Sequence, residues 1–84
     1  MNMTPSIQTF ILNWSDIASS WGMNRTIAQI HALLLVSQEP LTADEIKLSL
    51  QVARSNVSVS LRELHNWGLI ETVTVMGDRK KRFK

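Results

Sequence analysis

The sequence predicts a single, mainly α-helical domain that ends in a small β-hairpin. Its 84 residues allow one domain and not two. Between residues 5 and 67, apolar residues recur at helical spacing in four segments, which capping and helix-breaking residues separate. After Gly68 the spacing changes to the period of two that is typical of a β-strand, and Gly77-Asp78 marks a turn.

The composition is that of a folded protein inside the cell. Apolar residues make up 44% of the chain, too many for a disordered tail, and the absence of cysteine excludes disulfides, zinc–thiolate sites and thiol chemistry. The longest unbroken apolar run, Ala32–Val36, is far shorter than the ~20 residues that a membrane helix needs. Because no basic segment precedes an apolar one at the N-terminus, we expect no secretory signal, no membrane association and a cytoplasmic location.

The first helix is expected from Pro5 to Gly22. Thr4 can cap it with its hydroxyl, and Pro5 suits the first position, where no backbone N–H is needed. Its apolar residues fall within one arc of ~120° on a helical wheel; they are Ile7, Phe10, Ile11, Trp14, Ile17, Ala18 and Trp21. This stripe can pack on its own domain or on a second subunit. In the second case the dimer contact would consist of Ile7, Phe10, Ile11, Trp14 and Trp21.

The second helix, roughly Arg25 to Ser37, is expected at the centre of the fold. Asn24 can cap it, and apolar side chains cover nearly its whole circumference, which is the pattern of a buried helix. His31 lies between Ile27 and Leu35 on the wheel. We expect a hydrogen-bonded core histidine there, and a ligand role is the less favoured alternative.

Two short helices follow, joined by a turn of three residues. Thr42–Glu45 fits a capping box, in which each side chain accepts a hydrogen bond from the other residue's backbone N–H. The helix that it opens extends over Ala43–Leu50, and the next helix extends over Arg54–Trp67. The inward residues of this last helix are spaced four and three apart; they are Val57, Leu61 and Leu64.

A hairpin with a strongly basic end closes the sequence. Leu69–Val75 alternates with a period of two and is rich in β-branched residues, and Lys81–Lys84 can return as a second strand. Leu41 can add one or two residues of strand beside them. Residues 77–84 carry five of the nine lysines and arginines and a single acid. This asymmetry indicates a polyanionic partner, unless the basic end serves solubility alone.

Together these parts are those of a winged helix-turn-helix: two helices joined by a short turn, then a hairpin with a basic tip. With its aliphatic side inward, the fourth helix turns small hydroxyls, amides, one valine and arginines outward. Arginine can bridge O6 and N7 of guanine, asparagine suits adenine, valine can touch a thymine methyl group, and serine can bind phosphates or base edges. The predicted DNA-binding residues of this helix are Arg54, Ser55, Asn56, Ser58, Val59 and Arg62, with Asn66 on the same outer face.

An ordinary solvated helix surface would carry interspersed Glu and Lys instead. The stretch Ser55–Ser60 is a poor helix former, and weak helix formers on an exposed face favour a contact role. The basic tip of the hairpin, Arg79–Arg82, follows a tight turn and is expected to project from the body. Because a narrow minor groove attracts arginine, we predict Arg79 there, with Lys80 and Lys81 on the flanking phosphates.

Six stretches, taken in order, resemble one known family. They are Gly22-Met23-Asn24-Arg25, Glu39-Pro40-Leu41-Thr42, Ala53-Arg54-Ser55-Asn56-Val57-Ser58, Leu61-Arg62-Glu63-Leu64, Trp67-Gly68-Leu69-Ile70 and Gly77-Asp78-Arg79-Lys80. Residues 22–84 thereby resemble the DNA-binding domain of a MarR-type winged helix regulator, especially of its GbsR-like branch. The resemblance implies a homodimeric transcription regulator, with Arg54–Trp67 in the major groove and Gly77–Arg82 at the minor groove of double-stranded DNA.

The sequence departs from this family's pattern at three places. Ala53 stands where Ser or Thr usually caps the recognition helix, which loses ~1 kcal/mol. Gln51 stands where the turn usually has glycine, so a left-handed backbone there would be strained. The family usually continues into C-terminal helices that build the dimer and the effector pocket. Without them, dimerisation would fall on the first helix or association would be weak, and no small-molecule effector can be named.

Other functions fit the sequence less well. Catalysis is not expected, because no acid is placed to orient either histidine, no serine lies in a nucleophile elbow, and no cluster of metal ligands or cofactor motif occurs. The main alternative is a winged helix that docks proteins without binding DNA. RNA binding lacks an aromatic pair on a strand. A ligand sensor built on Trp14 and Trp21 is less favoured than core or dimer packing.

Overall fold

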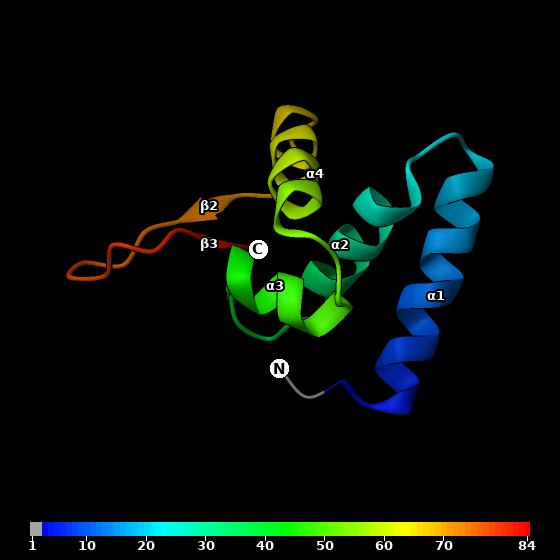
Figure 1. Ribbon diagram of the computed structural model, residues 1–84, viewed down its shortest axis with the longest axis horizontal. Helices are drawn as coiled ribbons and strands as arrows, with labels where there is room; N and C mark the ends of the chain where they lie inside the picture. The colour runs from blue at the N-terminus through cyan, green and yellow to red at the C-terminus, as the bar shows by residue number, and fades with distance from the viewer. Residues whose placement is uncertain (1–2) are drawn as a thin grey trace.

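All four expected helices form in the computed structural model, which describes residues 3–84 (Figure 1). In chain order the elements are α1 (Pro5–Ser20), α2 (Arg25–Val36), β1 (Leu41–Thr42), α3 (Ala43–Leu50), α4 (Arg54–Asn66), β2 (Thr72–Val73) and β3 (Arg82–Phe83). The fold class is therefore the predicted one, mainly helical with a small antiparallel sheet. No helix of the described residues is both long and apolar enough to cross a membrane.

Side-chain caps begin three of the helices, as the sequence predicts. The Thr4 hydroxyl accepts from the Ile7 N–H (3.2 Å), and the Asn24 side chain accepts from the Thr26 N–H (2.9 Å). Thr42 and Glu45 form the expected capping box, with distances of 2.9 and 3.2 Å. Each cap satisfies backbone donors that the first turn of a helix leaves free.

Helix α2 forms the centre of the core, and α1 and α4 both pack against it. Ile30 and Leu33 on α2 are fully buried. The inward side of α4 contributes the three predicted residues, which are Val57, Leu61 and Leu64. The prediction that α2 is buried all round is wrong at Leu35, which is 55% exposed. The packing of α1, α3 and α4 buries most of the other apolar side chains of α2 but leaves that side open.

The turn between α3 and α4 is built from residues that suit it poorly. Gln51 adopts the left-handed conformation (φ 55°, ψ 46°), so the strain expected at this position is present. For an L-residue this conformation costs roughly 1–2 kcal/mol. Ala53 occupies the N-cap of α4 with extended backbone and makes no side-chain hydrogen bond to the helix. The helix that carries the predicted DNA-binding residues therefore begins without a cap.

Replacing Ala53 with serine should stabilise the protein. Its backbone (φ −66°, ψ 145°) already has the extended geometry of an N-cap, so a serine hydroxyl can accept from the first turn of α4. The free energy of unfolding should rise by ~1 kcal/mol, measured by urea denaturation. Ala53→Val is the control, because valine changes the side chain at this exposed position without supplying an acceptor. An equal gain in both variants would contradict the capping argument.

The sheet has the order β1-β3-β2, with both pairings antiparallel. Phe83 lies between Leu41 and Thr72, and Arg82 lies between Thr42 and Val73. The expected contribution of Leu41 is confirmed, but the long strand expected over Leu69–Val75 is reduced to two residues. The hairpin projects away from the helices (Figure 1), so the apolar residues beyond Val73 find no core to pack against.

Candidate nucleic-acid interface

The outer face of α4 is open to solvent along its whole length. All six predicted side chains on it are exposed: Arg54, Ser55, Asn56, Ser58, Val59 and Arg62. They are brought to one surface because the opposite side of α4 is held in the core by its aliphatic residues. No segment of residues 3–84 covers this face. The side chains that could contact base edges are therefore free to do so.

The two arginines of this face differ in their surroundings. Arg62 forms no ion pair with any carboxylate of the described residues. The Arg54 guanidinium lies 2.7 Å from the Asp44 carboxylate at the start of α3. Both partners of that pair are largely exposed, and such pairs contribute little to stability. Arg54 can therefore exchange Asp44 for a phosphate at small cost, whereas Arg62 is already free.

Two neighbouring clefts join α4 to the hairpin. The first, about 360 Å³, runs between α4 and the sheet, and the second, about 370 Å³, continues towards the basic tip; Ala43, Arg54, Lys81 and Phe83 line both. Arg62 lines the first cleft, and Arg79 and Lys80 line the second. The structure thus brings Arg54, Ser58 and Arg62 of α4 and the three basic residues of the hairpin tip to one largely cationic face, on which Asp44 is the one acid of the described residues that lines the two clefts. Ser55 lines neither cleft, and Asn56 and Val59 line a separate hollow beside the start of α2.

His65 and Thr72 also line the first cleft but are absent from the predicted site. His65 lies three residues after Arg62 on α4, so helical spacing alone could have placed it beside Arg62. Thr72 is on β2, and its place opposite α4 follows from the packing of the sheet, which no local pattern in the sequence reveals. Both side chains can donate hydrogen bonds to an anion in the cleft.

Within the hairpin, hereafter the wing (residues 69–84), Asp78 organises the tip. Its carboxylate accepts from the Lys80 backbone N–H (2.9 Å) and from the Arg82 guanidinium (3.1 and 3.3 Å). These hydrogen bonds to the Lys80 N–H and Arg82 hold the pKa of Asp78 below its ordinary value of 3.8. The tip is therefore a hydrogen-bonded loop whose central carboxylate stays ionised at neutral pH.

The expectation that Arg82 projects with the other basic residues is wrong. Its side chain is 32% exposed; it turns back towards the body, and its guanidinium bridges Asp78 (3.1 Å) to Glu45 on α3 (3.4 Å). The reason is the position of β3 in the middle of the sheet, which points the Arg82 side chain towards the α3 N-terminus. By contrast, the other three predicted wing residues, Arg79, Lys80 and Lys81, are exposed and have no carboxylate partner among the described residues.

The comparison with known families agrees with this geometry. A model of the MarR family matches residues 21–81, which is most of the chain and includes α4 and the tip of the wing. The chain belongs to the MarR family. This family consists of winged helix transcriptional regulators and not of enzymes, in line with the expectation from the sequence.

A solved structure is similar to this MarR-family chain over nearly all of its length. It is a crystal structure described as that of a transcriptional regulator, with a TM-score of 0.89 and 27% sequence identity over 95% of this chain. The chain covers 55% of that protein, so it spans about half the length of the structure that it matches. Among proteins of curated function, none matches.

The apolar stripe of α1 in this MarR-family chain is divided between the core and the surface. Ile11 is buried within the chain's own core, so it has almost no surface to offer a second subunit; Ile7 and Trp14 are half-buried. Phe10, Ile17 and Trp21 are exposed, Trp21 by 75%. The Phe10 and Trp14 rings stack with centroids 6.2 Å apart. The aromatic residues Phe10, Trp14 and Trp21, hereafter the aromatic ledge, form a surface that is narrower than the predicted stripe.

His31 packs beside this ledge and is not the hydrogen-bonded histidine that the sequence predicts. Its ring meets Trp14 edge-on with centroids 5.8 Å apart, and its Nδ1 is buried without a hydrogen-bond partner. Because burial disfavours the charged imidazolium, the pKa of His31 lies below its ordinary value of 6.5. Burial of the ring therefore favours its neutral form.

Stability should therefore decrease as the pH falls through 6.5. The unfolded chain keeps a histidine pKa near 6.5 and binds a proton that the folded chain resists, so acid shifts the equilibrium towards unfolding. Urea denaturation between pH 7.5 and 5 should show this slope in the wild type and a flatter one in His31→Gln. The lowered pKa values of Glu45 and Asp78 act only at lower pH, outside this window. Equal slopes for the two proteins would contradict the assignment.

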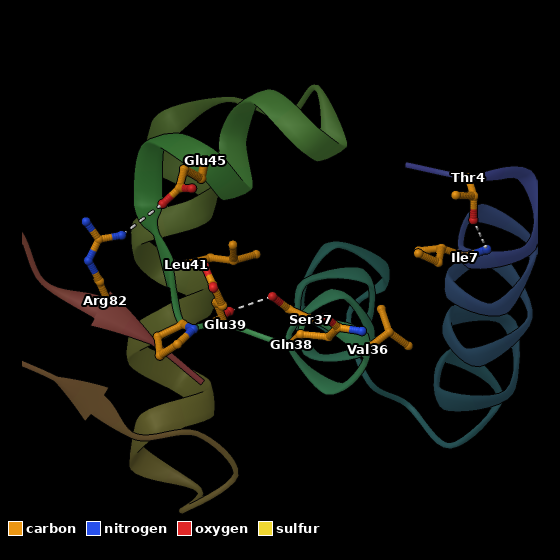
Figure 2. Close-up of a pocket in the computed structure, with 10 residues that line it drawn as sticks. Thr4, Ile7, Val36, Ser37, Gln38, Glu39, Leu41, Glu45 and Arg82 are labelled. Carbon is orange, nitrogen blue, oxygen red and sulfur yellow. Dashed lines mark hydrogen bonds and ion pairs between the residues drawn. The ribbon is translucent and has the colours of Figure 1, made fainter. Parts of the chain in front are cut away.

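A separate cavity of about 420 Å³ lies at the other side of the sheet, between the start of α1, the end of α2 and β1 (Figure 2). Its apolar wall includes Ile7, Val36 and Leu41, and its polar wall includes Glu45 and Arg82. Figure 2 shows Arg82 reaching Glu45 across the edge of the cavity. Since the same guanidinium holds Asp78, one side chain connects this cavity with the tip of the wing.

Proposed function

We propose that residues 1–84 act as one DNA-binding unit of a transcriptional regulator that recognises a specific sequence in double-stranded DNA. In this proposal α4 enters the major groove and the wing reaches the adjacent minor groove. The observation that carries it is the uncovered cationic face on which Arg62 of α4 and Arg79, Lys80 and Lys81 of the wing lie along connected clefts. Such a surface fits the phosphate backbone between two grooves, with base edges in reach of α4.

The finer features of the proposal follow from the same residues. The six stretches named above favour the GbsR-like branch of the family. The aromatic ledge of α1, with Phe10, Trp14 and Trp21, is the surface that we assign to a second copy, so that a homodimer would meet an inverted repeat with half-sites about one helical turn apart. A protein that works on genomic DNA in this way is expected in the cytoplasm.

Selection of bound duplexes from a random pool tests the proposal. We expect an enriched sequence, bound with an affinity that falls linearly on a plot of log K against log salt. If three to five cations per subunit neutralise phosphates, the slope should be about −2.7 to −4.5 for each subunit. A protein-docking module would enrich no sequence and would bind every duplex weakly and alike, through its exposed cations at low salt. Sedimentation of the free protein and of the complex gives the number of subunits.

Arg79→Ala should weaken binding to all duplexes by a similar factor. An arginine at the minor groove interacts with the potential of the groove and the phosphates, which every sequence offers. The affinity should fall and the salt slope should lose ~1 per subunit, measured by titration at several salt concentrations. Lys47→Ala, which removes a cation from α3 outside both clefts, is the control and should change neither. A loss confined to the selected sequence would argue against this role.

A further inference from the structure

The wing ends in an apolar side chain. Val75–Asp78 form a tight turn in which the Asp78 N–H donates to the Val75 carbonyl oxygen (3.0 Å), with Met76 and Gly77 as its central residues. Gly77 has φ +85°, which the third position of a type II turn requires. Met76 at the apex is 100% exposed, more than any other large apolar residue of the described chain. It stabilises nothing within its own chain, so packing does not account for a methionine there.

Positive charge and a fixed backbone surround this side chain. Arg79, Lys80 and Lys81 follow the turn, exposed and without carboxylate partners among residues 3–84. Asp78 ties the turn to Lys80 and Arg82, so the apex is held by hydrogen bonds and not by a core. Figure 1 shows this end of the wing as an arm directed away from the four helices. The far end of the wing thus presents the exposed Met76 side chain with three exposed basic side chains beside it.

We propose that Met76 is a wedge that enters the stacked bases from the minor groove and bends the duplex. This inference rests on the proposed function, since it requires the wing to reach that groove. Proteins that bend DNA from the minor groove insert apolar side chains, methionine among them, between base steps and kink the duplex by ~20–90°. Methionine suits the task because its unbranched thioether is flexible and polarisable enough to fill the opened step.

The wedge and the basic residues have separate roles. Arg79 in the minor groove and Lys80 and Lys81 on the flanking phosphates would hold the duplex beside the opened step, and Met76 would replace part of the lost stacking. Pyrimidine–purine steps unstack most easily, whereas A-tracts are stiff. The wing would therefore select a deformable step without reading base edges. This adds a source of sequence preference separate from the contacts of α4.

The test uses the duplex selected from the random pool, with 2-aminopurine placed in turn at each step and dyes at both ends. In the wild-type complex, 2-aminopurine fluorescence should rise at one step as the base unstacks, and the dyes should come closer. Met76→Ser should abolish both signals. It should also lose a preference of about tenfold for a pyrimidine–purine step over an A-tract at that position. The variant should fold as the wild type does, since the side chain is fully exposed.

Two further variants sharpen the result. Met76→Leu should keep the fluorescence rise and the bend, because leucine can also act as a wedge. Leu48→Ser removes another exposed apolar side chain (73%), on α3 and away from the wing, and should change neither signal. A wild-type complex without any rise, or an equal bend with Met76→Ser, would overturn the wedge while leaving the proposed function intact. Failure to bind any duplex would overturn the proposed function and the wedge with it.

Discussion

Arg62→Ala should relax the sequence preference of the protein at one or two base pairs. Arg62 is exposed on the outer face of α4 and has no carboxylate partner in the described chain, so its guanidinium is free to bridge O6 and N7 of a guanine. Losing such a contact should cost ~1–3 kcal/mol of discrimination against the wrong base. The measurement is competition between the selected duplex and duplexes with single substitutions at each position.

Arg62→Lys separates base recognition from charge. Lysine keeps the positive charge but lacks the planar fork that meets two acceptors at once. We expect Arg62→Lys to bind unrelated duplexes about as well as the wild type and yet to discriminate poorly. Neither variant should lower stability, because the Arg62 side chain makes no hydrogen bond or ion pair to another residue in the part of the chain that the structure describes. Equal losses on every sequence would show that Arg62 contacts a phosphate instead.

The helical part of this fold could be predicted from local patterns. Thr4, Asn24 and Thr42 each precede an apolar repeat, and the structure shows all three as helix caps. The inward residues of α4 follow from their spacing of four and three, and once they are buried the outer face is fixed as well. Sequence reasoning succeeded here because capping and helical periodicity act within one helix and the residues that flank it.

The wing and the surroundings of His31 could not be predicted in the same way. Arg82 pairs with Glu45, which is 37 residues earlier in the chain, and β3 lies between its hairpin partner β2 and the distant strand β1. No period in the sequence encodes such contacts. The alternation over Leu69–Val75 was misleading because its outer half lies on a projecting arm with no second layer to pack against. His31 meets Trp14 across two helices, a contact that a single helical wheel does not reveal.

The contact between Asp78 and Arg82 leads to an expectation that opposes simple electrostatics. Asp78→Ala makes the wing more positive, so attraction to phosphates alone would strengthen DNA binding. We expect the opposite. Without Asp78 the Lys80 N–H and the Arg82 guanidinium lose their acceptor, and the tip has to be ordered when DNA binds. Affinity for every duplex should fall about tenfold, a factor set by the cost of fixing a single residue's backbone.

Arg82→Ala tests whether the two residues act as one unit. It removes a cation where Asp78→Ala removes an anion, yet both should weaken binding by a similar factor because both release the tip. The double variant should bind no more weakly than either single variant, since the contact can be lost only once. Additive losses would mean that Arg82 contacts DNA on its own. Tighter binding by Asp78→Ala would mean that the charge of the wing matters more than its order.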